Sequence, residues 1–250
     1  MARKKHIDHL DEYYLTPSKP TGPSKRKNKT AGNREGWTPS PKMIQFGLKN
    51  EEQEEAWSLF KEVDVMFLLG PAGTGKSHIA IMFAIYDMLA HGRQKLVLTR
   101  PIVEAGENLG FLPGDLSEKV HPYMLPLYDC LDKVCGVTGD VRDWMNERYE
   151  LAPLAFMRGR TFENAVCVLD EAQNCCEKQL KMFLTRLGGE PGNAKMLITG
   201  DPEQTDSGRR NYALIDTVDK IRHLPGVGVI EFTEQAVCRH PLVREFGKLL

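Results

Sequence analysis

The sequence lacks a long hydrophobic segment. None of its apolar runs approaches the roughly 18 residues that a membrane-spanning helix needs. Its first residues, MARKKHIDHLDEYY, are charged where a secretory signal is apolar. The six cysteines form no CxxC pair and no spacing typical of metal ligands. We therefore expect a cytoplasmic protein that binds no membrane and whose cysteines are core or incidental thiols.

A large excess of charge is also absent, because the formal net charge is −1. The charge is nevertheless unevenly spread: residues 1–40 carry nine Lys or Arg against four Asp or Glu. Residues 16–40 are rich in Pro, Gly, Ser, Lys and Asn and have little to bury, which predicts a disordered basic N-terminal arm over residues 1–40. Its Lys25–Lys29 cluster suits electrostatic binding of nucleic acid, and a solubilising tail is the alternative.

Residues 41–250 alternate short apolar runs with amphipathic stretches. This alternation is typical of parallel strands joined by helices, so we expect one α/β domain in which helices flank a parallel sheet. The expected strands are Val65–Leu69, Leu96–Thr99, Val166–Leu169, Met196–Thr199 and Val229–Phe232. The expected helices are Glu51–Lys61, Lys76–Ala90, Glu177–Arg186 and Tyr212–His223.

A phosphate-binding loop follows the first expected strand. GPAGTGKS matches GxxxxGK[ST] in full, with the apolar run VMFLL before it and the helix-forming run HIAIMFAIYDMLA after it. The glycines allow a tight turn whose amides point at phosphate oxygens, Lys76 reaches the β and γ phosphates, and Ser77 is placed to ligate Mg²⁺. The predicted nucleotide-binding residues of this loop are Gly70, Pro71, Ala72, Gly73, Thr74, Gly75, Lys76 and Ser77.

Residues 111–150 are less regular than the rest of this domain. Pro113, Pro122 and Pro126 interrupt the helical pattern there. We expect a small helical insertion over the nucleotide face.

Two carboxylates follow a later apolar run, VCVL. At the end of that strand, Asp170 is placed to hold the Mg²⁺ shell opposite Ser77, and Glu171 is the candidate to orient or deprotonate the attacking water. The alternative is that both acids merely cap the following helix. Because they follow a complete phosphate-binding loop and end an apolar strand, the sequence favours the catalytic interpretation.

Three further residues are candidates for contacts with the nucleotide. Gln204, in TGDPEQTD at the next strand end, has an amide able to contact both the γ-phosphate and the water, and an ordinary surface turn is the alternative. Gln53, shortly before the first strand, carries a donor and an acceptor that match the edge of adenine, against a solvated helix as the alternative. Arg239, after the last strand, is a candidate arginine finger on the γ-phosphate.

These strings together resemble the PhoH family of ATPases, whose core is similar to the first motor domain of superfamily 1 helicases. The resemblance spans residues 42–250 and implies a single RecA-like P-loop NTPase domain with ATP and Mg²⁺ as cofactors. It also implies that Lys76, Glu171, Gln204 and Arg239 are the catalytic set. The carriers are GPAGTGKS, TRPIVEAGENLGFLPGDLSEKVHPY, MRGRTFENAVCVLDEAQN, LTRLG, TGDPEQTD and CRHPLV.

The same resemblance implies a nucleic-acid path. Helicase-like proteins hold a strand with residues after the second strand of the sheet, which here are Thr99, Arg100 and the loop Glu104–Gly110. Arg158 and Arg160 are further candidates for phosphate or RNA contacts, and structural pairing with carboxylates is the alternative for both.

A superfamily 1 helicase closes a second motor domain over its nucleotide, and 250 residues leave no room for one. We therefore expect a ring-shaped homo-oligomer, a hexamer by resemblance, with an arginine at the subunit boundary. The expected function is Mg²⁺-dependent ATP hydrolysis coupled to binding or remodelling of RNA or single-stranded DNA. The alternative is a nucleotide-gated binding or assembly protein that hydrolyses slowly and does not unwind.

Overall fold

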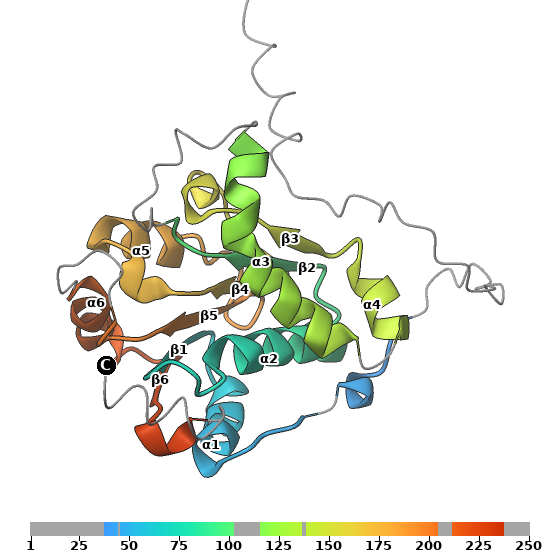
Figure 1. Ribbon diagram of the computed structural model, residues 1–250, viewed down its shortest axis with the longest axis horizontal. Helices are drawn as coiled ribbons and strands as arrows, with labels where there is room; N and C mark the ends of the chain where they lie inside the picture. The colour runs from blue at the N-terminus through green and yellow to red at the C-terminus, as the bar shows by residue number, and fades with distance from the viewer. Residues whose placement is uncertain (1–37, 45, 103–115, 137–138, 205–211, 238–250) are drawn as a thin grey trace, which may run out of the picture.

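The computed structural model describes residues 38–44, 46–102, 116–136, 139–204 and 212–237. A single six-stranded sheet organises them (Figure 1), in the order β3-β2-β4-β5-β1-β6, and every pair of neighbouring strands is parallel. The strands are β1 Val65–Leu69, β2 Lys95–Thr99, β3 Tyr149–Leu151, β4 Ala165–Leu169, β5 Lys195–Gly200 and β6 Val227–Glu231.

Helices cover both faces of the sheet. The helices are α1 Glu51–Phe60, α2 Lys76–His91, α3 Leu116–Cys135, α4 Gly139–Met145, α5 Glu177–Leu184 and α6 Ala213–Ile221. The apolar residues of α1 to α4 form one core cluster with one face of the strands, and those of α5 and α6 form a second cluster with the other face. Short 3₁₀ turns complete the order: η2 Pro41–Met43, η4 Leu154–Met157, η5 Ala172–Asn174 and η6 Glu234–Ala236.

The interior strands are apolar throughout because helices cover them on both faces. All residues of β1, β4 and β5 are buried, whereas the edge strand β6 alternates buried and partly exposed positions. The predicted α/β class and the five predicted strands are confirmed, and so are the four predicted helices, with ends that differ by one or two residues. Within the described residues, no helix is long and apolar enough to span a bilayer.

The expected helical insertion includes α3, and two of the prolines that interrupt the sequence pattern do not interrupt this helix. Pro122 and Pro126 lie inside α3, a continuous 20-residue helix that runs beside α2 (Figure 1). The two prolines are four residues apart on the exposed side of α3, where water can bond the carbonyls that lose a donor. The opposite side carries the buried Val120, Met124 and Leu127, whose packing outweighs the lost hydrogen bonds.

The strand β3 was missed. It has only three residues, and its central residue is a glutamate, which is typical of a surface position. The edge position becomes stable because Glu150 is paired: Arg160 donates to both of its carboxylate oxygens at 2.6 and 2.9 Å, and Lys95 lies 2.5 Å from it. Pairing of this kind depends on packing between distant parts of the chain, which a periodicity argument does not contain.

Candidate functional site: a phosphate-binding loop at the strand ends

The loop between β1 and α2 depends on glycines at its two ends. Gly70 has φ +137°, and a Cβ there would lie 2.4 Å from the backbone oxygen of Phe232. Gly75 caps α2 in the left-handed region, with φ 85°. The loop therefore packs closely on the end of β6, and its last residue turns directly into the first turn of α2. This places the amino terminus of a 16-residue helix at the site.

The side chain of Lys76 lies inside this loop. It is 9% exposed, and Nζ donates to the carbonyl oxygens of Gly70 at 2.6 Å and Pro71 at 2.7 Å. A cation held by neutral carbonyls retains its full charge toward an anion. The loop therefore presents its ammonium group where a terminal phosphate would be cradled.

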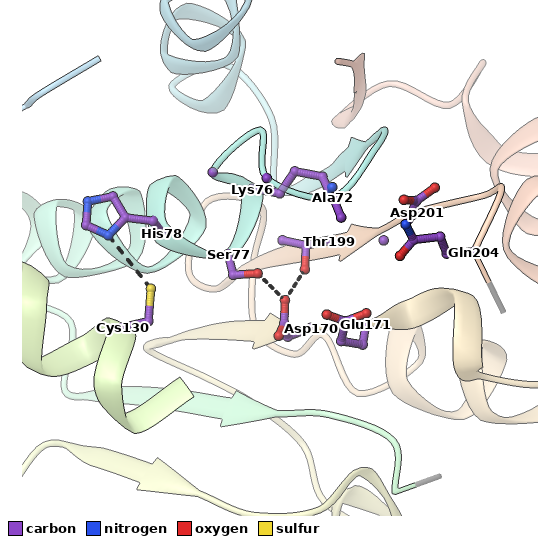
Figure 2. A pocket seen from close by; sticks show the side chains of 13 residues that line it. Ala72, Lys76, Ser77, His78, Cys130, Asp170, Glu171, Thr199, Asp201 and Gln204 are labelled. Carbon is purple, nitrogen blue, oxygen red and sulfur yellow. Dashed lines mark hydrogen bonds between the residues drawn. The ribbon is translucent and has the colours of Figure 1, made fainter. Parts of the chain in front are cut away.

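Three oxygen-bearing side chains converge at the ends of α2, β4 and β5 (Figure 2). Asp170, 4% exposed, accepts hydrogen bonds from the hydroxyls of Ser77 at 2.6 Å and Thr199 at 2.5 Å, both on Oδ1. Asp170 makes no ion pair with any residue that the structure describes. One carboxylate and one hydroxyl suit Mg²⁺, which takes few protein ligands and completes its shell with phosphate oxygens and water. The sequence-predicted pair Ser77 and Asp170 is thus brought together.

Glu171 lies at the same edge, in an unusual backbone conformation. Its φ of 55° and ψ of 43° are left-handed, which is uncommon for a residue other than glycine, asparagine or aspartate. Gln173 donates to Oε2 of Glu171 at 2.5 Å, and Arg100 lies 3.8 Å from Oε1. Gln173 also accepts from the backbone N–H of Asp201 at 3.0 Å. The carboxylate is therefore held from two sides.

These groups line one cavity of about 310 Å³. The cavity lies between the loop, the ends of β4 and β5, and α3 (Figure 2). Its lining residues are Ala72, Gly73, Gly75, Lys76, Ser77, His78, Cys130, Asp170, Glu171, Thr199, Gly200, Asp201 and Gln204.

Gln204 faces this cavity from a turn. Its backbone N–H donates to the carbonyl of Asp201 at 3.3 Å, and the N–H of Glu203 donates to the Asp201 carboxylate at 3.0 Å. Gly-Asp-Pro therefore does form the turn that was the alternative interpretation, and that turn places Gln204 on the cavity wall. Arg239, like the loop Glu104–Gly110 and nearly all of the basic arm, lies outside the described residues.

Gln53 lies behind the loop and does not line the cavity. It is 2% exposed; its Nε2 donates to the Thr74 carbonyl at 2.9 Å, and its Oε1 accepts from the N–H of Lys49 at 2.9 Å. A Cβ on Gly75 would lie 3.3 Å from the same amide nitrogen. In this arrangement the side chain braces the phosphate-binding loop against α1, and the donor and acceptor expected to face adenine bond to backbone groups.

The four candidates for nucleic-acid contacts differ in burial and in their partners. Thr99 is fully buried at the end of β2, so its side chain does not reach the surface. Arg160 forms the bidentate pair with Glu150, which is the structural alternative considered for it. Arg158 is exposed and makes no ion pair within the described residues. Arg100 lies at the site itself, partly exposed, beside Glu171.

Sequence reasoning missed five residues that line the cavity, His78, Cys130, Thr199, Gly200 and Asp201. It also missed Gln173, which bonds to Glu171. His78 directly follows Ser77, Gln173 lies two residues after Glu171, and Thr199 ends the predicted strand that precedes Gln204, so their positions were a usable signal. Cys130 comes from α3, and nothing local marks it. Its thiol lies 3.8 Å from Nδ1 of His78, and burial raises the pKa of Cys130 to about 12. The thiol therefore stays protonated at neutral pH.

The pKa of His78 is lowered, first by burial and then by the nearby Lys49 and Lys133. A lowered pKa favours the neutral form of its ring at pH 7.

The sequence is similar to a family model and to proteins of several bacteria. A family model described as PhoH-like protein matches residues 45–250. The PhoH-like protein of Bacillus subtilis is 44% identical over 244 residues, covering 97% of this chain and 70% of the relative. Protein PhoH of Escherichia coli K12 is 38% identical over 197 residues, covering 78% of this chain and 55% of the relative.

Among solved structures, the large terminase of a thermophilic bacteriophage in complex with ADP matches with a TM-score of 0.50 at 12% identity. The match covers 79% of this chain and 49% of the terminase. At that identity the likeness shows a P-loop NTPase fold and nothing further.

Proposed function

The chain belongs to the PhoH-like family, and from this premise we propose that it hydrolyses ATP with Mg²⁺ and couples hydrolysis to binding of RNA or single-stranded DNA. The arrangement of Lys76, Ser77 and Asp170 around one cavity carries the proposal. A lysine inside a glycine loop, facing a carboxylate–hydroxyl pair, suits a nucleoside triphosphate with its divalent cation and little else.

Each residue has a defined part in the proposed reaction. Lys76 exchanges its two carbonyl acceptors for β- and γ-phosphate oxygens, and Ser77 with Asp170 would hold Mg²⁺, which neutralises phosphate charge when bound. The oxygen of a water forms a bond to the γ-phosphorus while the bond from that phosphorus to the β–γ bridging oxygen breaks. Glu171 takes the proton of the water, and ADP leaves with the electron pair.

Gln204 and Arg239 complete the proposal at the γ-phosphate. Gln204, on the cavity wall, is proposed to orient the water and report the terminal phosphate. We propose that Arg239 reaches that phosphate across a subunit boundary in a ring, a hexamer by family resemblance. Mass photometry that finds a fully active monomer would exclude the ring.

Arg100 and Arg158 are the proposed strand contacts, helped by the basic arm. Guanidinium groups bind phosphates through paired hydrogen bonds. Arg100 is partly exposed and Arg158 is exposed. Thr99, being buried, is left out of this set.

The test is ATP turnover with and without single-stranded RNA and DNA, in wild type and in Lys76→Ala. Lys220→Ala is the matched control, because Lys220 is an exposed lysine paired with Glu177 on the surface. We expect turnover to vanish only in Lys76→Ala and to rise several-fold with a strand. Turnover that ignores both strands would remove the nucleic-acid half, and nucleotide binding without turnover would favour the nucleotide-gated alternative.

A further inference from the structure

Polar contacts run through Glu171 from one side of the sheet edge to the other. The N–H of Asp201, after β5, donates to Gln173, and Gln173 donates to one oxygen of Glu171. Arg100, the residue after β2, approaches the other oxygen. The candidate base is therefore tied to both neighbouring strand ends.

The two ties differ in strength and exposure. The Gln173 hydrogen bond is 2.5 Å long, and Gln173 is 3% exposed. The Arg100 contact is 3.8 Å long and lies between side chains that are 19% and 37% exposed. Ion pairs with such geometry contribute little stability and exchange readily for other partners. Gln173 thus positions the carboxylate, whereas Arg100 holds it only loosely.

The rest of the Arg100 side chain faces α3. Its Nη1 donates to the carbonyl of Tyr123 at 3.4 Å, a long hydrogen bond to a neutral acceptor. Both of these contacts are weaker than the bidentate pair that a guanidinium forms with a phosphate. A strand phosphate at the end of β2 would outcompete both.

We propose that Arg100 restrains Glu171 and that a nucleic-acid phosphate releases it by taking over the guanidinium. While Arg100 lies beside Oε1, its positive charge stabilises the ionised carboxylate and so opposes transfer of a proton from the attacking water to Glu171. When a nucleic-acid strand binds Arg100, Glu171 keeps its hydrogen bond to Gln173 and can accept the proton of the attacking water. This inference rests on the proposed function and describes how that function is regulated. The phosphate of a bound nucleic acid and the Glu171 carboxylate compete for Arg100.

Because competition is reciprocal, strand affinity measures it without any hydrolysis. Glu171→Gln removes the charge that holds Arg100, so we expect several-fold tighter binding of a labelled single-stranded RNA by fluorescence anisotropy. Arg100→Ala should weaken binding about 10-fold. In the Arg100→Ala background, Glu171→Gln should change the affinity no further, since the group it frees is gone.

Additive effects of the two substitutions would overturn the proposal, because they would show that Glu171 repels the strand by charge alone. Unchanged affinity in Glu171→Gln would overturn it as well. Arg222→Ala is the control, since Arg222 pairs only with Asp219 and Glu231 among the described residues. Arg222→Ala should leave the affinity for RNA unaltered, both alone and when combined with Glu171→Gln or Arg100→Ala.

Turnover gives the second readout. Arg100→Ala should raise turnover in the absence of a strand several-fold and bring the stimulation by RNA close to one. Arg100→Lys keeps the positive charge but lacks the planar guanidinium, so its basal turnover and its stimulation by RNA should lie between those of wild type and Arg100→Ala. Lower basal turnover in Arg100→Ala would overturn the restraint and make Arg100 a direct helper of hydrolysis. Absence of any turnover in wild type would refute the proposed function, while the binding cycle would still decide on Arg100.

Discussion

Two buried aspartates lie at opposite ends of the sheet and are held in different ways. Asp87, near the end of α2, faces Arg93 and His91, and Arg93 also donates to the carbonyls of Gly192 and Asn193. Asp170, at the carboxyl end of β4, is held by two hydroxyls. A buried carboxylate with a full counter-ion cannot lose its charge without leaving that counter-ion unpaired, whereas one held only by neutral donors retains its charge for a ligand.

The sharpest test of this comparison makes the same substitution at both places. We expect Asp87→Asn to cost about 3–5 kcal/mol in the free energy of unfolding, since it leaves the buried Arg93 without its counter-ion. Chemical denaturation measures this. Turnover per folded molecule should not change. A loss of turnover without a loss of stability would contradict a purely structural role for Asp87.

Asp170→Asn should show the reverse. The amide preserves the hydrogen bonds to Ser77 and Thr199 and removes a buried charge that no cation balances within the described residues. Turnover should fall at least about 100-fold, because the proposed metal site loses its charged ligand. The thermal midpoint should stay or rise. A drop in the midpoint comparable to that of Asp87→Asn would show that Asp170 serves the fold.

A second buried carboxylate with structural partners, Glu150, makes a prediction about how stability depends on pH. Burial alone would raise the pKa of Glu150, but hydrogen bonds and charge from Arg160 and Lys95 outweigh it and hold the pKa below the ordinary 4.5. The stabilisation is therefore present above pH 4.5 and is lost as the pH falls through the lower folded value. Arg160→Ala should cost about 2 kcal/mol at neutral pH and move the midpoint of acid unfolding to higher pH.

Circular dichroism during acid titration measures that midpoint, with Arg158→Ala as the control. Arg158 is exposed and has no carboxylate partner in the described chain, so its removal should leave the midpoint in place. Equal shifts in both variants would mean that the pair with Glu150 does not hold the edge strand.

The contrast also shows which features a sequence can predict. The loop Gly70–Ser77 and the acids after β4 follow from contiguous residues and from the meeting of parallel strand ends at one edge, so the location of the site was predictable. The partner of Arg160 was not, because Glu150 sits on a strand too short to recognise. Gln53 was assigned to adenine from its chemistry alone, and its contact with Thr74 depends on how α1 packs behind the loop.

The smallest expected effect separates two neighbours, Thr99 and Arg100. The Thr99 hydroxyl is buried and has no hydrogen-bond partner in the part of the chain that the structure describes. Replacing such a group by a methyl of the same shape is neutral or stabilising, so Thr99→Val should change the free energy of unfolding by less than about 1 kcal/mol. The affinity for RNA should also stay within about twofold, since the proposed contact is made by the adjacent Arg100.

Anisotropy with the same RNA checks this beside Arg100→Ala. If Thr99→Val lost strand affinity while remaining stable, the hydroxyl would have to turn outward on binding. The end of β2 would then rearrange, and the restraint on Glu171 would be released by movement of that strand end, with exchange of the arginine as a consequence. Because Asp170 donates its N–H to the Thr99 carbonyl at 2.9 Å, such a movement would also displace the carboxylate proposed to bind the metal.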